Sequence, residues 1–146
     1  MATFSAPDLN SKAMPMGNYG NAAVVYGTAT PSSGVVGSIY RLVRIPAGMS
    51  VTALRIVNDD MDTGGTTFAV KIGYTPVDSG QGPVEDDDYF SAATTILSGV
   101  ALTDLRFQPI KFEKDVYVIL TVTVPATAFA SGNITAIVAG EATGIK

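Results

Sequence analysis

The stretch DVYVILTVTV at residues 115–124 constrains the fold more than any other part of the chain. Its side chains alternate between two faces, as they do along a β-strand. One face is wholly aliphatic and consists of Val116, Val118, Leu120, Val122 and Val124. The other face is mixed and consists of Asp115, Tyr117, Ile119, Thr121 and Thr123. Because the aliphatic face needs a partner sheet, while the mixed face suits partial solvation, the strand predicts a core between two sheets.

Shorter apolar runs, separated by clusters of Gly, Pro, Asn and Asp, predict the remaining strands. We expect them at residues 21–30, 35–45, 50–58, 66–74, 105–110 and 134–139, with 94–102 as a strand or a loop. The turn at 46–49 predicts an antiparallel hairpin between its two flanking strands. One short helix is expected at 86–93, since three aspartates would cap its start. The predicted fold is all-β: an antiparallel, jelly-roll-like β-sandwich of about eight strands, with one short helix in a loop.

Residues 21–146 form a single β-sandwich domain in this prediction, and residues 1–20 form an extended N-terminal arm. Prolines and glycines interrupt the arm, and its apolar residues do not recur with the spacing of a helix or a strand. It is either a frayed terminus or a segment that becomes ordered on a neighbouring subunit. Its sparse apolar residues, Met14, Met16 and Tyr19, are candidate partner contacts.

The charge of the chain excludes several classes of partner. Only 15% of the residues are charged, against about 25% in ordinary domains. This indicates either a neutral-polar surface or a surface covered by other subunits. The net charge of −4 argues against nucleic-acid binding. No apolar run approaches the length of a membrane span, and the first residues do not resemble a secretion signal, so we expect no membrane partner.

Catalysis is not expected, and neither is a cofactor. The chain contains no histidine, so a Ser-His-Asp arrangement has no base, and no cysteine, which fits assembly in a reducing cytoplasm. The carboxylates of Asp59, Asp60 and Asp62, and those at 85–88, could serve a glycan hydrolase. The absence of tryptophan and the small number of aromatic residues argue against a sugar-binding cleft of that kind.

The acidic turn at 58–65 is a weak candidate for a calcium site. Asn58, Asp60 and Asp62 recur at every second residue, as oxygen ligands do in calcium loops. The EF-hand pattern nevertheless fails, because Thr63 and Ala69 stand where it requires Gly and Glu. The alternative is a solvated turn whose side chains hydrogen-bond to their own backbone.

Charged residues within predicted elements are further candidates for partner contact. Alternation places Arg41 and Arg44 on opposite faces of one strand, and Arg55 on the next strand. They either extend along the margin of a sheet or contact another subunit. The aspartates Asp86, Asp87 and Asp88 either cap the expected helix or contact a basic partner surface.

Several segments together resemble small structural proteins of tailed phages. These are IPAGMSVTALRIVNDDMDTGGTTFAVKIGY, DDDYFSAATT, KFEKDVYVILTVTV and GNITAIVAG, which span about residues 38–140. The family is the head cement, or decoration, proteins of certain short-tailed phages. The resemblance implies a jelly-roll β-sandwich that sits on the capsid exterior of the virion after assembly in the bacterial host cytoplasm. It also implies binding to neighbouring major capsid protein subunits, and a homo-oligomer, either a dimer or a trimer.

Two other functions stay open at this stage. The chain could be a tail or head-fibre module that binds a surface glycan, or the carboxylate-dependent hydrolase considered above. A high copy number in virus particles would favour the cement protein, whereas a low copy number would favour the tail or fibre module.

Overall fold

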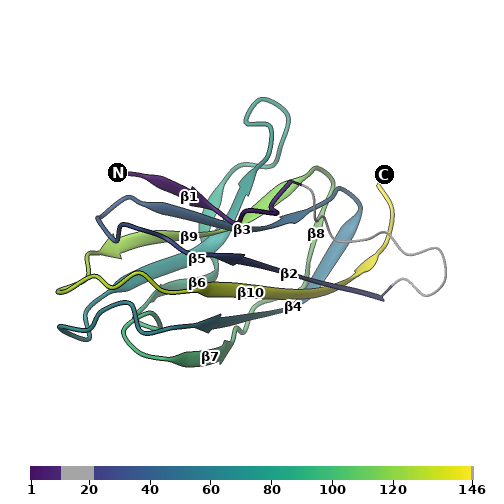
Figure 1. Cartoon of the computed structure of the whole chain (residues 1–146). Coiled ribbons are helices and arrows are strands. Elements are labelled where there is room, and N and C mark those ends of the chain that lie inside the picture. The colour runs from purple at the N-terminus through teal and green to yellow at the C-terminus, as the bar shows by residue number, and fades with distance from the viewer. Residues whose placement is uncertain (11–21, 146) are drawn as a thin grey trace.

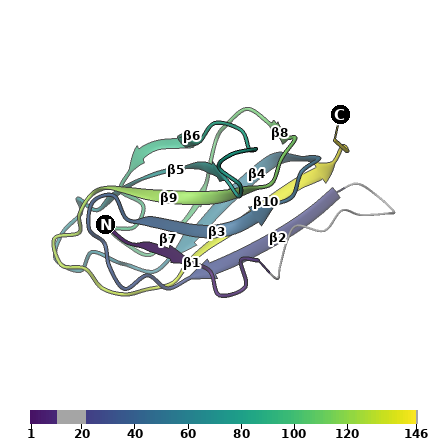
Figure 2. The ribbon, with the colours of Figure 1, turned by 90° about the horizontal axis from the view of Figure 1, so that it is seen from above.

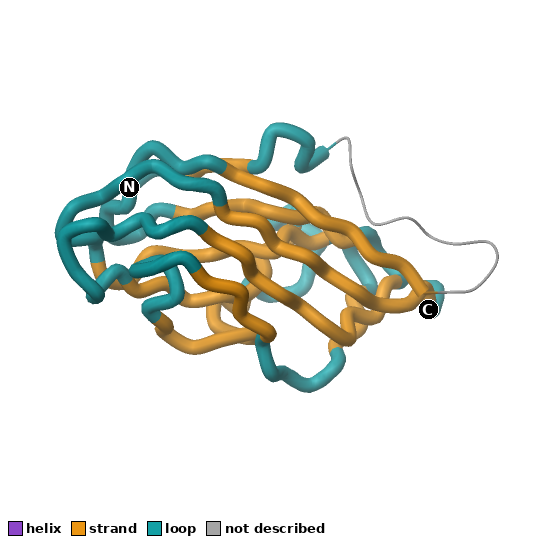
Figure 3. Tube along the Cα trace, turned by 60° about the horizontal axis from the view of Figure 1, so that its bottom comes forward, coloured by secondary structure: helices purple, strands orange, loops and turns teal. Residues whose placement is uncertain are grey.

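The computed structural model describes residues 1–10 and 22–145, and these residues form ten β-strands. The strands are β1 (Thr3–Ser5), β2 (Ala22–Ala29), β3 (Ile39–Ile45), β4 (Met49–Asn58), β5 (Ala69–Pro76), β6 (Asp86–Thr94), β7 (Ala101–Asp104), β8 (Ile110–Phe112), β9 (Val116–Val124) and β10 (Ile134–Ala142). They run along the long direction of the molecule, and loops join them at its two ends (Figure 3). Within the described residues, no helix has the length and hydrophobicity that crossing a membrane requires.

Two sheets pack face to face and enclose the core (Figures 1 and 2). Sheet A has the order β1-β3-β9-β5-β6, and sheet B has the order β2-β10-β4-β7, with β8 pairing beside β7 on β4. From β2 to β5 the chain passes from one sheet to the other at every step. This alternation is the connectivity of a jelly-roll-like sandwich, and it confirms the predicted all-β fold class.

The alternating strand lies in the middle of sheet A, as β9 between β3 and β5. Val116, Val118 and Leu120 have no exposed surface, and Val122 has almost none, so the aliphatic face lies in the core as predicted up to Val122. Val124, at the end of the strand, is 42% exposed. Inward residues of β5, namely Val70, Ile72 and Tyr74, extend the same layer, also as predicted.

The predicted hairpin between residues 35–45 and 50–58 is wrong. The first of these strands pairs with β1 and β9 in sheet A, whereas the second pairs with β10, β7 and β8 in sheet B. The turn at 46–49 therefore carries the chain across the sandwich. Both strands have a strongly apolar side, and crossing lets each side cover the core from a different sheet.

The predicted helix at 86–93 is also wrong, because these residues form β6 at the edge of sheet A. Phe90 is buried and packs edge-on against Phe107, with 4.8 Å between ring centroids. Two register shifts in the pairing of β6 with β5 leave extra residues in β6, between Asp86 and Ser91 and between Ser91 and Thr94. Aspartates that would cap a helix instead occupy an irregular edge strand, a place where charge discourages pairing with another chain.

Bulges change which residues face outward. A register shift in β3 between Arg41 and Val43 places Leu42 and Val43 in the core, and leaves Arg41 and Arg44 on the same outer face. Strict alternation had put these two arginines on opposite faces. A bulged residue adds one position to a strand, so every later side chain points to the other side.

The start of the chain is part of sheet A rather than a free arm over its whole length. Thr3–Ser5 pair in parallel with Ile39–Arg41, and the Phe4 ring lies against the Tyr40 ring at 6.0 Å between centroids. Leu9 is buried in the core cluster. Met14, Met16 and Tyr19, which were candidate contacts, lie outside the described residues.

Candidate interaction surfaces

The outer face of sheet A is partly covered by the chain itself. Ile119 is on this face, opposite to the core side of β9, yet it is 0% exposed, and Tyr117 is also buried. The Tyr117 hydroxyl donates a 2.8 Å hydrogen bond to Oδ1 of Asn10. On the neighbouring strand β5, Gly73 pairs with Ile119. A Cβ atom on Gly73 would overlap the backbone of Asp86 and Asp87, so the start of β6 lies directly against this face. The sequence predicted a partly solvated face here, because it does not reveal these covering segments.

An ion pair links two strands at the end of this face. Nη2 of Arg44 lies 2.5 Å from Oδ2 of Asp115, and its Nε donates to the same oxygen at 3.1 Å. The backbone N–H of Ala47 donates to Oδ1 of Asp115 at 2.8 Å. Burial acts to raise the pKa of Asp115, but the hydrogen bonds from Arg44 and Ala47 outweigh it and hold the pKa below its usual value. Asp115 therefore stays ionised and fixes the turn at 46–49 against β9.

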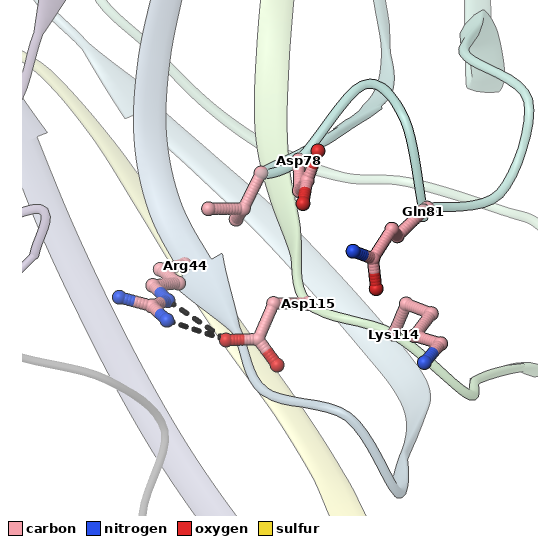
Figure 4. Close-up of a pocket in the computed structure, with 7 residues that line it drawn as sticks. Arg44, Asp78, Gln81, Lys114 and Asp115 are labelled. Atoms are coloured by element: carbon pink, nitrogen blue, oxygen red, sulfur yellow. Dashed lines mark hydrogen bonds and ion pairs between the residues drawn. The ribbon is translucent and has the colours of Figure 1, made fainter.

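A pocket of about 250 Å³ opens beside this ion pair (Figure 4). Its lining residues are Arg44, Val77, Asp78, Gln81, Gly82, Lys114 and Asp115. The loop between β5 and β6 contributes Asp78, which lies above Asp115 in this view, and Gln81, which lies on the side of Asp115 away from Arg44. A neighbouring cavity of about 420 Å³ shares Gln81, Gly82 and Lys114 and is bounded by Tyr74 and Phe112. The lining of the two hollows is mixed, with polar groups such as Asp78, Gln81 and Lys114 beside the apolar side chains of Val77 and Phe112.

Arg41, the second candidate arginine on this face, stacks its guanidinium over the Tyr117 ring at 5.2 Å from the centroid. Its buried Nε has no hydrogen-bond partner among the described residues. Stacking on an aromatic ring is a common packing mode of arginine, so the contact holds Arg41 against its own sheet.

The three candidate aspartates lie at the opposite edge, where two of them contact a lysine of β5. Nζ of Lys71 lies 3.3 Å from Oδ1 of Asp87 and 3.5 Å from Oδ2 of Asp88. The hydrogen bond with Asp87 raises the pKa of Lys71. Asp86 accepts a long hydrogen bond, 3.4 Å, from the backbone N–H of Asp88. Lys71 therefore balances one of the three negative charges within sheet A.

The calcium candidates Asn58, Asp60 and Asp62 make hydrogen bonds to the backbone of neighbouring loops. The amide Nδ2 of Asn58 donates to the carbonyls of Asp59, Ile96 and Gly99, which holds the loop after β6. Oδ1 of Asp60 accepts from the backbone N–H of Asp62. Oδ1 of Asp62 accepts from Ala128 N–H at 3.0 Å, and this bond holds the pKa of Asp62 below its usual value. Oδ1 of Asn58 and Oδ2 of Asp62 are buried without a hydrogen-bond partner among the described residues, so the calcium site stays a prediction.

The outer face of sheet B is the surface that sequence reasoning missed. Exposed apolar side chains lie on both of its margins, with Val24 at 64% and Tyr26 at 55% on β2, and Leu102 at 60% on β7. Arg55, the third candidate arginine, lies between them and pairs with Asp104, with Nε 2.6 Å from Oδ1. The available signal was the inner side of β2, whose small residues Ala23 and Ala29 left the larger ones outward.

Comparison with known proteins finds the same fold in phage capsid structures. A chain from the capsid of Ralstonia phage GP4 superposes with a TM-score of 0.79 and 17% identity over 99% of both chains. A chain from the Cyanophage Pam1 capsid asymmetric unit gives 0.68 and 19% identity over 88% of this chain and 91% of that one. A chain from the acidic stable capsid structure of Helicobacter pylori bacteriophage KHP30 gives 0.60 and 13%, over 85% and 90%. No family model matches the sequence, and no curated protein does.

Proposed function

We propose that this protein is a structural component of a phage virion that binds the outside of the capsid and stabilises it by clamping neighbouring major capsid protein subunits. The observation that carries the proposal is the likeness to the GP4 capsid structure, because it extends over 99% of both chains. Two further capsid structures share the fold. In this role the protein acts as a homo-oligomer, without catalysis and without a cofactor.

The construction of the molecule supports a role that depends on stiffness. The core runs through the whole sandwich, and its largest side chains, such as Tyr40, Phe68 and Phe90, are almost fully buried. Dense packing of this kind resists deformation. A clamp on a shell under internal pressure needs such a body, with its contact residues held on rigid strands and short loops.

We assign the shell contact to the loop between β5 and β6. This loop projects beyond the two layers (Figure 1). Val84 within it is 89% exposed, and the adjacent hollows offer Lys114 and Gln81 as polar partners. An exposed apolar side chain beside polar side chains is typical of a small protein–protein contact. When many copies each make such a contact on one capsid lattice, the total binding energy becomes large.

Two measurements test the proposed function. The first is the copy number of the protein in purified particles, relative to the major capsid protein. Hundreds of copies in a simple ratio are expected, whereas a few copies per particle would indicate a tail or fibre module instead. The second is the temperature at which particles release DNA, with and without the protein. Particles that lack it and release DNA at an unchanged temperature would refute the stabilising role.

A matched pair of variants tests the contact site. Val84→Glu should weaken rebinding of the purified protein to shells that lack it, because a charge replaces the exposed apolar group. Val36→Glu is the control, since Val36 is also an exposed valine but belongs to the connection between β2 and β3. Equal rebinding of both variants would place the shell contact elsewhere.

A further inference from the structure

We propose that the larger hollow beside the loop between β5 and β6 binds a large apolar side chain of a partner segment, with a carboxylate of that segment next to Lys114. We call this hollow the anchor pocket; it has a volume of about 420 Å³ and is lined by the loop and by β8. The inference rests on the proposed function, because it names the chemistry of the shell segment that this loop contacts. Its test uses the isolated protein and small probes, so its failure is distinguishable from failure to bind a shell.

The floor of the anchor pocket is aromatic and is packed from below. Phe112 and Tyr74 are buried, and their rings meet edge-on at 4.9 Å between centroids. Tyr74 also lies against the core residue Phe90, at 6.4 Å between ring centroids. Because both lining rings are buried, little of either ring face is open for a sugar to stack on. The floor therefore favours an apolar side chain over a glycan.

Backbone hydrogen bonds hold both walls of the pocket in place. In the loop, the N–H groups of Gln81 and Gly82 donate to the carbonyl of Asp78, at 3.2 and 2.9 Å. The N–H of Val77 donates to the carbonyl of Asp115 at 3.0 Å, and this bond fixes the base of the loop to the chain before β9. On the other side, β8 is held by its pairing with β4. Since both walls are ordered before a ligand arrives, binding loses little free energy to ordering.

The volume and the apolar sides of the pocket suit one large side chain. Small-ligand pockets typically measure about 300–1,000 Å³, so a hollow of about 420 Å³ accommodates a leucine or a phenylalanine side chain. Pro83 and Ile110 line the pocket and are partly exposed, so they offer apolar surface to what enters. Burial of an apolar anchor in such a pocket is a common source of binding energy. Val84, the exposed residue of the proposed shell contact, directly follows Pro83 and makes the pocket continuous with that contact.

The rim of the pocket has one lysine that forms no ion pair among the described residues. Nζ of Lys111 lies 2.9 Å from Oε1 of Glu113, so these two charges balance each other. Lys114 lines both hollows and is absent from the ion pairs that the described residues form. Asp78 lines the smaller hollow only, and its Oδ1 accepts the N–H of Gly80 at 2.9 Å. The anchor pocket therefore has a net positive rim, which complements a carboxylate beside the bound side chain.

Three small probes separate the two parts of the proposal. N-acetyl-leucine has both the side chain and the carboxylate, N-acetyl-leucinamide has only the side chain, and N-acetylglycine has only the carboxylate. Each is added up to about 50 mM to the isotope-labelled protein at neutral pH and constant ionic strength, and the backbone amide signals are followed by NMR. N-acetyl-leucine should give saturating shifts at Gln81, Gly82 and Lys111, with a dissociation constant on the order of 1–10 mM. N-acetyl-leucinamide should bind about threefold more weakly, and N-acetylglycine should not saturate.

A charge-matched pair of variants tests the role of the lysine. Lys114→Gln should bind N-acetyl-leucine and N-acetyl-leucinamide equally. Arg106→Gln is the control, because it removes the same charge from an exposed residue that lines neither hollow, and it should keep the preference of about threefold. Ile110→Asn should weaken binding of both leucine probes at least about threefold, with the dispersion of its NMR spectrum as the check on folding.

Three results would overturn the inference: shifts with N-acetyl-leucine that do not saturate, N-acetylglycine binding as tightly, or a preference for the carboxylate that persists in Lys114→Gln. An unchanged affinity of folded Ile110→Asn would do the same. Probe binding as expected, in a protein that fails to bind shells, would refute the proposed function and leave the anchor pocket in place.

Discussion

The substitution Ile119→Ala tests whether the outer face of sheet A is closed. Ile119 is 0% exposed although it points away from the core side of β9. Removing three carbons costs about 2.4 kcal/mol in transfer free energy, at about 0.8 kcal/mol per methylene. The cavity left behind adds to this, and buried Ile→Ala substitutions typically cost about 2–5 kcal/mol. We expect a loss of about 3 kcal/mol in the free energy of unfolding, close to that of Leu120→Ala on the core face.

The assay is urea unfolding followed by circular dichroism, with thermal melting as a second measure. A loss of about 3 kcal/mol corresponds to a fall of about 6–12 °C in melting temperature for a chain of this length. Val124→Ala is the matched control, because Val124 ends the same strand but is 42% exposed, and should cost under about 1 kcal/mol. If Ile119→Ala costs under about 0.5 kcal/mol while Leu120→Ala costs several, the outer face is solvated, and the covering segments do not protect it.

Three further outcomes are expected. Asp115→Asn should lower the free energy of unfolding by about 1–2 kcal/mol near neutral pH, since Arg44 loses a charged acceptor at a partly exposed site. The pKa of Asp115 is lower in the folded state, so its contribution to stability is present above the unfolded pKa of about 3.9 and disappears as pH falls through the folded value. Denaturation curves should therefore show that the difference in free energy of unfolding between the wild type and Asp115→Asn disappears below about pH 4. A difference that does not change with pH would contradict the ion pair. Millimolar calcium should leave the melting temperature of the wild type unchanged. Asp62→Ala should lower the melting temperature, because Asp62 accepts a hydrogen bond from the Ala128 N–H. A melting temperature that rises with calcium in the wild type but not in Asp62→Ala would show that calcium binds at this turn. Gly140→Ala should destabilise by about 1–3 kcal/mol, since its Cβ would overlap the Ser50 carbonyl at a bulge; a cost within about 0.5 kcal/mol would mean that the bulge relaxes.

Side-chain alternation was a reliable guide wherever pairing was regular. It assigned the core faces of β9 and β5 and the outward position of Lys71, because both strands keep their phase across the positions that matter. It failed at bulges. In β4, strict alternation would place Val51 on the same face as Arg55, yet Val51 is fully buried. The register shift opposite Ala139 and Gly140 leaves Thr52 as an extra residue, and this reverses the phase.

Local signals were also weaker than long-range pairing at residues 86–93. Three aspartates before an aromatic pair satisfy the rules for a helix start. The segment instead gains a strand partner in β5 and buries Phe90 among other aromatic rings. Burial of a large aromatic side chain exceeds the energy of a helix cap, so the tertiary contact decides the conformation.

The sequence by itself determined the fold class, the central strand and the core face of that strand, because hydrophobic period depends only on the order of residues. The tertiary structure decided which strands share a sheet, which arginines share a face, and which surfaces stay open. Arg41 and Arg44 came together through a bulge, Ile119 was covered by distant segments, and the outer face of sheet B arose from four strands that are far apart in the chain. These features depend on the pairing of remote segments, and no local pattern of residues encodes that pairing.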